Sequence, residues 1–200
     1  GEKEVFVVES VYRDFLKAFE AAGAHKLNSQ QLERLTAAAF PMKDDGSGNS
    51  HPVLNRELVG QDVSVLAQHA GADVPRGTEL LYAETDENHL FVVEEQMMPM
   101  IPVIPVKDVH EGIAKAKKAE HGYKHSSMIH SLNVRHMTEM AKALESTLFV
   151  KNGPCVAGLG SGGEGYPSFS VATTTGEGIT TPDTFTRRRR CVLVDSLSMM

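Results

Sequence analysis

LFVVEEQMMPMIPVIPVK, Leu90 to Lys107, is the longest apolar run of the chain, and the acidic pair Glu94 and Glu95 interrupts it near its start. Prolines recur three residues apart in its second half, at Pro99, Pro102 and Pro105. Because proline donates no backbone hydrogen bond, helices and central strands both disfavour it. The run is also too short and too often interrupted for a membrane span. We therefore predict an extended, buried strand from Met100 to Val106, with a sheet edge as a position that would tolerate the prolines.

The residues after this strand predict a helix. Asp108 is followed three positions later by Glu111, the capping-box pattern that opens helices, and apolar residues then recur at core spacing up to about Glu120. A strand that follows the acidic residue Glu95 and leads into a helix capped at Asp108 suits a catalytic or binding site. Ordinary core packing explains the same residues, so both interpretations stay open on the residues alone.

The composition is that of an ordinary globular protein. The chain has 200 residues, 41% of them hydrophobic and 23% charged, which suits one domain or a domain with an arm. The net charge of -6 argues against a nucleic-acid partner, which usually requires a basic surface. Two cysteines are too few for a disulfide framework and favour a reducing compartment. The sequence shows no signal peptide and no membrane segment, and its opening on an apolar, strand-like run suggests a piece of a longer protein.

Strand patterns alternate with helix patterns along the chain. Apolar, β-branched and aromatic runs predict strands at 4–9, 80–83, 100–106, 127–130 and 147–150. Capping residues predict helices that begin at Ser10, Asn28, Asp62, Asp108 and Asn133. The first of these helices would turn Val11, Phe15, Ala18, Phe19 and Ala22 to one face. The segment 43–52 has the composition of an exposed, mobile loop. The alternation predicts an α/β fold with a largely parallel sheet and helices on both faces.

A glycine-rich loop from Lys151 to Gly165, KNGPCVAGLGSGGEG, contains a G-x-G-x-x-G match at Gly158, Gly160 and Gly163. That motif binds a pyrophosphate at the N-terminus of the helix that follows it. The next residues, YPSF, carry no helix signal, so we interpret the match as accidental. A loop that packs close to another backbone, or to a ligand, explains the glycines better.

The cysteines and histidines also have structural explanations. Cys155 would need a base and an electropositive setting to act as a nucleophile, so a small buried thiol is the favoured interpretation, and Cys191 is expected to be structural too. Histidines crowd one region, at His121, His125, His130 and His136. No carboxylate or thiolate completes a convincing ligand set around them. We therefore expect no metal site.

A basic, strand-like tail from Thr184 to Asp195 lies near the end of the sequence. Its run Arg187 to Arg190 has the composition of a nucleic-acid or targeting patch, but alternate residues of a strand point to opposite faces, which would divide the patch. A strand at a chain end also has backbone groups that need a partner. We expect this arm to add a strand to a sheet of another subunit.

Six segments carry a resemblance to a known family. In chain order they are GEKEVFVVES, EQMMPMIPV, HSSMIHSLN, FVKNGPCVAGLGSGGEG, TTGEG and TFTRRRRCVLVD. Together they resemble the coenzyme A-acylating aldehyde dehydrogenases of bacterial microcompartments, the propionaldehyde and acetaldehyde enzymes. The resemblance covers nearly the whole chain, and the order and spacing of the segments make it specific. Only the region 43–59 lacks a counterpart.

The resemblance implies a dehydrogenase of three parts: a nucleotide-binding domain, a catalytic domain with a nucleophilic cysteine, and an arm that adds a strand to a neighbouring subunit. This chain would be a catalytic-domain portion, residues 1–183, with a C-terminal oligomerisation arm at 184–200. In the family the cysteine lies in a Pro-Cys-Ile segment just before the Gly-Glu-Lys found here at Gly1. The resemblance therefore implies no catalytic residue in this chain, and no activity of the chain alone.

A few site residues carry over by the same resemblance. Glu95 aligns with the glutamate of the Glu-x-Phe-Gly-Pro motif of aldehyde dehydrogenases and would accept hydrogen bonds from the ribose of NAD. Met97 takes the place of the phenylalanine and Met98 that of the glycine, so the ring contact transfers only loosely. The substrate-channel candidates are Asn152, Pro154 and Cys155, with Cys155 as lining and not as nucleophile. Coenzyme A would be the co-substrate.

The implied activity is the conversion of propionaldehyde or acetaldehyde to its acyl-coenzyme A, in the cytoplasm and inside a bacterial microcompartment. The partners would be the aldehyde, coenzyme A and further copies of the chain, without nucleic acid or membrane. The two aldehydes, and NAD and NADP, fit the residues equally well. Two alternatives stay open: a non-enzymatic module that folds and oligomerises, and a hydrolytic branch of the aldehyde dehydrogenases.

Overall fold

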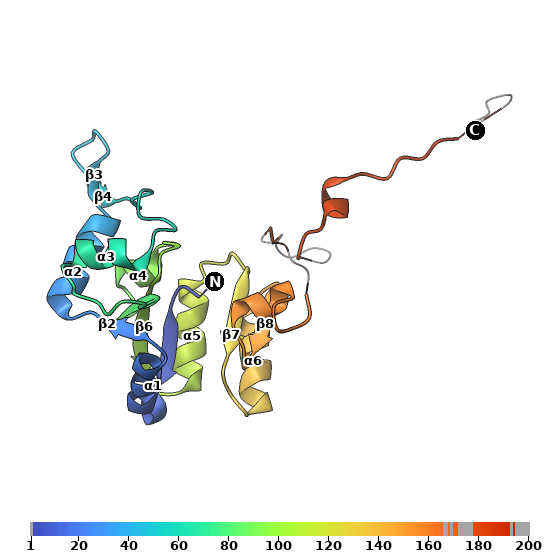
Figure 1. Ribbon diagram of the computed structural model, residues 1–200. Helices are drawn as coiled ribbons and strands as arrows, with labels where there is room; N and C mark the ends of the chain where they lie inside the picture. The colour runs from blue at the N-terminus through green and yellow to red at the C-terminus, as the bar shows by residue number, and fades with distance from the viewer. Residues whose placement is uncertain (1, 166–167, 169, 172–177, 193, 195–200) are drawn as a thin grey trace.

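The computed structural model describes residues 2–165, 168, 170–171, 178–192 and 194, whose arrangement Figure 1 shows. Strands alternate with helices through most of the chain, as the sequence predicts. The elements, in order, are β1 (Val5–Val8), α1 (Glu9–Ala21), β2 (Ala24–Lys26), α2 (Ser29–Ala39), β3 (Met42–Asp44), β4 (Ser50–Pro52), α3 (Val63–Ala70), β5 (Leu80–Glu84), α4 (Leu90–Val93), β6 (Met100–Val106), α5 (Val109–Ala119), β7 (Ser126–Ile129), α6 (Val134–Leu144), β8 (Leu148–Lys151) and the 3₁₀ helices η1 (Cys155–Leu159) and η2 (Pro182–Phe185).

The central sheet has four parallel strands in the order β1-β6-β5-β2. β6 therefore lies inside the sheet, and the expected position at an edge is wrong. The Val103 carbonyl accepts the Thr85 N–H, so Val103 faces β5, and by alternation Pro102 faces β1 and Pro105 faces β5. The register pairs β1 with β6 only from Val103 onward, and β5 with β6 only up to Val103. Each proline nitrogen thus points beyond the end of the neighbouring strand, where no ladder hydrogen bond is lost.

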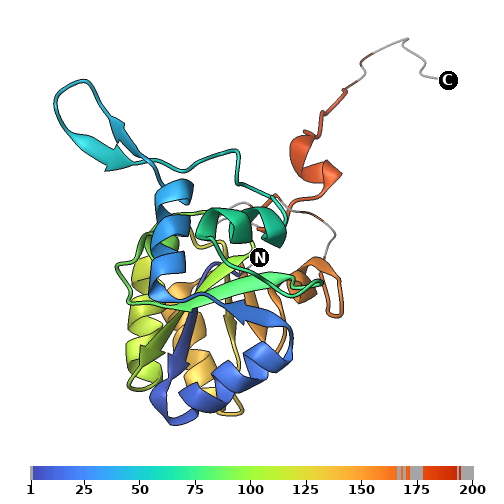
Figure 2. The same ribbon diagram turned by 60° about the vertical axis from the view of Figure 1, so that its left-hand side comes forward.

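Helices cover both faces of this sheet. Successive residues of β5 point to opposite faces: Tyr82 packs against Phe19 of α1, whereas Leu81 packs with Leu35 of α2 and Leu66 of α3. The turned view in Figure 2 shows these helices around the sheet. The predicted α/β fold with a largely parallel sheet and helices on both faces is confirmed.

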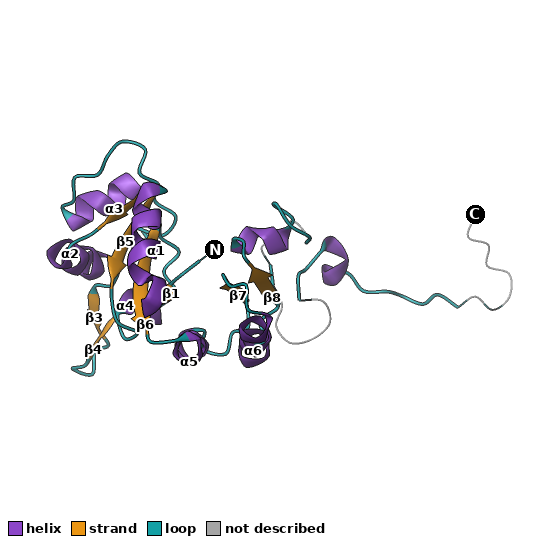
Figure 3. Ribbon diagram, turned by 90° about the horizontal axis from the view of Figure 1, so that it is seen from below, coloured by secondary structure: helices purple, strands orange, loops and turns teal. Residues whose placement is uncertain are grey.

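A second, two-stranded parallel sheet is formed by β7 and β8. α5 leads from β6 to β7 and packs against β1 on one side and α6 on the other. Figure 3 shows α5 and α6 side by side, with β7 and β8 apart from the four-stranded sheet. A small core from α5, α6 and the two strands, centred on Ile113, Ile129 and Met140, stabilises this part.

Most of the predicted helix starts are confirmed. Side chains of Asn28, Asp62, Asp108 and Asn133 accept backbone N–H groups at the starts of α2, α3, α5 and α6. The expected cap at Ser10 is wrong, because α1 begins at Glu9 without a side-chain cap. The face of α1 is also shifted: Val11 is half exposed, and Tyr12 and Leu16 pack with Phe15 and Phe19.

The segment expected to be a mobile loop forms an antiparallel hairpin instead. β3 pairs with β4, from Met42 opposite Pro52 to Asp44 opposite Ser50. Local bonds from the turn residues hold its tip: the Asp44 carboxylate accepts the Gly46 N–H at 2.8 Å, and that of Asp45 accepts the Ser47 N–H at 2.8 Å. Polar turn residues thus order a segment that has little apolar surface. The hairpin projects from the body (Figure 2).

The arginine-rich tail forms no strand in its described residues. Thr184 and Phe185 belong to η2, and residues 186–192 are extended without strand partners. Residues 193 and 195 of the predicted strand lie outside the described residues. The tail runs away from the helices and strands (Figure 1), and the side chains of Phe185 and Val192 are 75% and 73% exposed.

Candidate functional site

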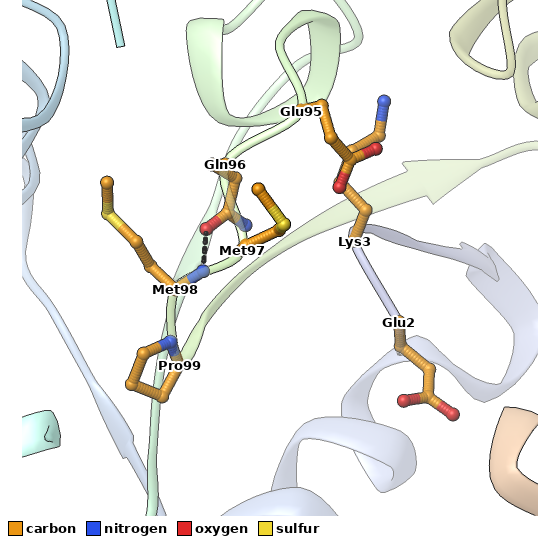
Figure 4. A pocket seen from close by; sticks show the side chains of 7 residues that line it. All are labelled: Glu2, Lys3, Glu95, Gln96, Met97, Met98 and Pro99. Atoms are coloured by element: carbon orange, nitrogen blue, oxygen red, sulfur yellow. Dashed lines mark hydrogen bonds between the residues drawn. The ribbon is translucent and has the colours of Figure 1, made fainter. Parts of the chain in front are cut away.

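A pocket of about 390 Å³ lies where the chain passes from α4 into β6. Its walls come from the segment 95–99 and from Glu2 and Lys3, which precede β1. β1 and β6 are neighbours in the central sheet, so the sheet itself brings together two segments that are over ninety residues apart. Figure 4 shows the side chains that line this pocket. It contains both sequence-predicted cofactor residues, Glu95 and Met97.

The turn from Glu95 to Pro99 is held by Gln96. This side chain is 1% exposed; its Oε1 accepts the Met98 N–H at 2.9 Å, and its Nε2 donates to the Met100 carbonyl at 2.8 Å. Met97, between them, adopts a left-handed φ of 47° and is 61% exposed. All three residues line the pocket, but only Met97 is exposed, whereas its two neighbours, Gln96 and Met98, are buried.

Charged groups just before β1 lie near Glu95. The Lys3 ammonium donates to the Ala119 carbonyl at 3.1 Å and lies 3.8 Å from the Glu4 carboxylate. Burial raises the pKa of Glu4 to about 7; the Lys3 charge opposes this shift and the charge of Glu95 adds to it. The pocket thus combines a lysine with carboxylates on both of its walls.

The three substrate-channel candidates, Asn152, Pro154 and Cys155, follow the carboxyl end of β8. A backbone hydrogen bond links Cys155 to a residue of the pocket. The Cys155 N–H donates to Glu2 Oε1 at 2.9 Å, and Glu2 lines the pocket. The Cys155 thiol is buried, 6% exposed, as expected for a structural thiol. Pro154 caps η1 with an extended backbone.

The Asn152 side chain does not face an open channel with free polar atoms, because both ends of its amide bond Ser131. Its Oδ1 accepts the Ser131 N–H at 2.8 Å, and its Nδ2 donates to the Ser131 carbonyl at 3.0 Å. Its own backbone is left-handed, with a φ of 52°. The amide therefore fixes the loop after β7 to the loop after β8.

The glycines after β8 are required by close backbone packing. A Cβ at Gly163 would lie 2.6 Å from the Ala157 carbonyl oxygen, and one at Gly158 would lie 3.0 Å from Leu148 Cδ2. Among the described residues the match is followed by bends and not by a helix. The interpretation as a closely packed loop is confirmed, whereas residues 166, 167 and 169, on which the argument against a dinucleotide motif depends, lie outside the described residues.

The histidines make separate local contacts. His121 Nε2 lies 2.9 Å from the Val93 carbonyl oxygen, His110 Nδ1 lies 2.7 Å from Glu139 Oε1, and His136 contacts Asn133. In the described part of the chain, no group of three His, Cys, Asp or Glu side chains could hold a metal ion. Within the same residues no helix is both long and apolar enough to span a membrane.

Sequence reasoning missed Glu2, Lys3, Glu4 and Gln96 as parts of the site. The only available signal was that GEKE and EQMMP both belong to segments with a family resemblance. A contact between them depends on the pairing of β1 with β6, which no local pattern shows.

Curated proteins and solved structures are similar to this chain in sequence and in fold. No protein-family profile matches the chain. It is 43% identical over 200 residues to the acetaldehyde dehydrogenase (acetylating) EutE of Salmonella typhimurium, and 37% identical over 200 residues to the propanal dehydrogenase (CoA-propanoylating) of Citrobacter freundii. These matches cover 100% of this chain but 42% and 41% of the two relatives, so the chain spans less than half of their length.

Solved structures agree. A propionaldehyde dehydrogenase from the Clostridium phytofermentans fucose utilisation bacterial microcompartment matches with a TM-score of 0.83 and 36% identity, over 100% of this chain and 44% of that one. The Rhodopseudomonas palustris propionaldehyde dehydrogenase with bound propionyl-CoA matches with a TM-score of 0.82 and 35% identity, over 96% of this chain and 41% of that one. The chain is thus a homologue of the coenzyme A-acylating aldehyde dehydrogenases and corresponds to less than half of their length.

Proposed function

We propose that this chain is the part of a coenzyme A-acylating aldehyde dehydrogenase that holds the nicotinamide cofactor over the reaction centre. One observation carries the proposal: Glu95 and Met97, which align with the family's cofactor motif, line one pocket together with the segment that precedes β1. Glu95 is exposed and offers a carboxylate to ribose hydroxyls. Met97 offers a polarisable, apolar contact.

The substrates would be a short aldehyde, acetaldehyde or propanal, with NAD or NADP and coenzyme A. The relatives in sequence are an acetylating and a CoA-propanoylating enzyme. Among the similar structures, an engineered glycolyl-CoA reductase has bound NADP+, and the R. palustris enzyme has bound CoA and an acylated cysteine. The pocket, with its exposed carboxylate, suits the neutral, hydroxyl-rich ribose better than a phosphate.

The proposed reaction has two halves. A cysteine thiolate, which the family resemblance places outside this chain, would add to the aldehyde carbonyl, and Glu95 and Met97 would hold the nicotinamide to which the hydride leaves. The coenzyme A thiol then attacks the resulting thioester, and the enzyme thiol is released as the acyl-coenzyme A forms. Glu95 would orient the cofactor for the first half and take no part in bond making.

A substitution at Glu95 tests the cofactor role. In the full-length dehydrogenase, Glu95→Gln is expected to raise KM for NAD about tenfold, because a charge-assisted hydrogen bond to a ribose hydroxyl becomes a neutral one. Glu94→Gln is the matched control, since Glu94 is also exposed but does not line the pocket. Equal KM values for NAD in wild type and Glu95→Gln would remove Glu95 from the site.

Activity of the chain alone tests the placement of the nucleophile. The purified 200-residue chain is expected to show no aldehyde oxidation with NAD and coenzyme A, because its buried Cys155 is not the reacting thiol. The measurement is NADH absorbance under saturating substrates. Turnover that Cys155→Ala abolishes would make Cys155 the nucleophile.

We further propose that the arm at 184–200 joins subunits, and that the assembled enzyme works in the cytoplasm inside a microcompartment. Exposed apolar side chains on an extended segment, with Val192 and Val194 73% and 81% exposed, support an interface. One similar structure comes from a bacterial microcompartment. Co-purification of tagged protein with compartment shells would test the location, and recovery in the shell-free fraction alone would contradict it.

A further inference from the structure

Gln96 is a buried amide inside the turn that carries both proposed cofactor-binding residues. It is 1% exposed, whereas its neighbours Glu95 and Met97 are exposed. Its oxygen is bonded to the Met98 N–H and its nitrogen to the Met100 carbonyl. Both ends of the amide are therefore used on the backbone that follows Met97, as Figure 4 shows for Met98. A buried amide with every bond local to one turn fixes the path of that turn.

The path that it fixes is an unfavourable one. Met97 has a φ of 47°, a left-handed conformation that non-glycine residues rarely adopt. Such a conformation persists only where the surroundings hold it, and it occurs often at ligand-binding positions. Two groups hold this one: Gln96 anchors the residues after Met97, and the Gly60 N–H donates to the Met97 carbonyl at 3.0 Å.

We propose that Gln96 is a positioning residue for the nicotinamide site: its amide holds the 95–99 turn so that Glu95 and Met97 meet the cofactor together. The proposal rests on the proposed function and extends it from residues that touch the cofactor to one that acts through them. Gln96 also lines the pocket, but its side chain is buried and both ends of its amide are bonded to backbone atoms of the turn. Its effect on the cofactor is therefore indirect.

Two substitutions of Gln96 remove different parts of this anchor. A leucine at position 96 would fill a similar volume, but it would leave the Met98 N–H and the Met100 carbonyl without their partner and so lower stability as well as loosen the turn. A glutamate would keep an acceptor for Met98 and lose the donor to Met100. Placement of Met97 should therefore worsen in the order wild type, Gln96→Glu, Gln96→Leu.

The first experiment measures the turn itself, in the 200-residue chain without any ligand. Methyl-¹³C methionine labelling reports on the nine methionines, and loss of one signal in Met97→Ala assigns Met97. In Gln96→Leu the Met97 methyl signal is expected to shift or broaden, and the Met98 amide is expected to exchange with deuterium about two- to tenfold faster. Gln68→Leu, at an exposed position of α3, is the control. An unchanged Met97 signal and an unchanged Met98 exchange rate would overturn the proposal.

The second experiment measures cofactor binding in the full-length dehydrogenase. Gln96→Leu is expected to raise KM for NAD about three- to tenfold with kcat within about twofold, and Gln96→Glu to give an intermediate value. Gln96→Glu also serves where the leucine variant fails to fold. A KM for NAD that Glu95→Gln raises and neither Gln96 variant raises would overturn this inference and leave the proposed function standing. An unchanged KM for NAD in all three variants would overturn both this inference and the proposed function. A fall in kcat with an unchanged KM for NAD in the Gln96 variants would assign Gln96 a structural role only and so overturn the inference.

Discussion

The Glu4 carboxylate lies largely buried beside the pocket, and within the described residues its Oε2 has no hydrogen-bond partner. The Lys3 ammonium lies 3.8 Å from this oxygen, close enough for an ion pair but too far for a hydrogen bond. Burial outweighs this attraction and, with the charge of Glu95, raises the pKa of Glu4 from 4.5 to about 7. The folded protein therefore holds a proton on Glu4 at pH values where the unfolded chain has lost it.

This shift predicts a pH-dependent loss of stability. Because the folded pKa lies above the unfolded one, stability is full below pH 4.5, falls as pH rises, and reaches its lower level above about pH 7. The whole change is at most about 3 kcal/mol. Glu4→Gln should be more stable than wild type at pH 8 and should flatten the curve between pH 5 and pH 8. Urea unfolding at several pH values measures this, with the exposed Glu33→Gln as control; parallel curves for wild type and Glu4→Gln would refute the shift.

Individual site residues were predictable only where a motif carried them. Glu95 and Met97 came from alignment with a family motif, and the pocket contains both. Cys155 was predicted to be a buried thiol because nothing near it in the sequence clearly supplies a base and an electropositive setting, and its thiol is buried. Glu4 and Gln96 were missed, because burial of a carboxylate and satisfaction of an amide are set by three-dimensional packing.

At the scale of elements, helix starts were predictable and strand neighbours were not. The caps at Asn28 and Asp108 involve residues three positions apart, so the pattern lies within a few residues of sequence. The central place of β6 depends on where β1 and β5 begin and end relative to Val103. Because β1 and β5 each pair with only part of β6, a central strand can contain prolines without losing ladder hydrogen bonds. The sequence of β6 itself does not reveal this offset between its two neighbours.

The contact between α5 and α6 gives a prediction at this scale. His110 of α5 and Glu139 of α6 are joined at 2.7 Å, and this hydrogen bond and the Glu139 charge raise the pKa of His110 above 6.5. The ring of His136 and the carboxylate of Asp108 also face His110, and Asp108 acts in the same direction. The pair therefore stabilises the fold fully below pH 6.5 and loses that contribution as pH rises through the folded pKa.

His110→Asn should consequently reduce unfolding free energy at pH 5.5 and have no effect at pH 9. The reduction should be small, because both side chains are well exposed. A double-mutant cycle with Glu139→Gln isolates the pair from other effects of either change. A coupling free energy that is the same at pH 5.5 and pH 9 would contradict a pair that depends on the charge of His110.

For the whole molecule, the alternation of strands and helices predicted a parallel α/β architecture, but it did not predict that the parallel strands divide into two sheets. Apart from the β3–β4 hairpin, the strands form a four-stranded and a two-stranded parallel sheet, joined through the packing of α5 on β1 and α6. Alternation with helices predicts that the strands within one sheet run parallel, and they do in both of these sheets. Which strands exchange hydrogen bonds is decided by contacts between distant segments, and so is the order β1-β6-β5-β2.

The arm gives the prediction that involves the whole assembly. The described tail residues 186–192 are extended and exposed, and they include the run Arg187–Arg190 and the apolar Val192. An extended segment with unpaired backbone groups and an exposed apolar side chain is suited to strand addition, and the arginines discourage pairing with arbitrary partners. In the full-length dehydrogenase, deletion of 186–200 is expected to lower the mass measured by light scattering to that of a smaller oligomer or a monomer. Replacement of Val192 and Val194 by serine should weaken the same assembly without shortening the arm, and Cys191→Ser should leave it intact. An oligomer of unchanged mass after the deletion would mean that the subunits associate through another surface.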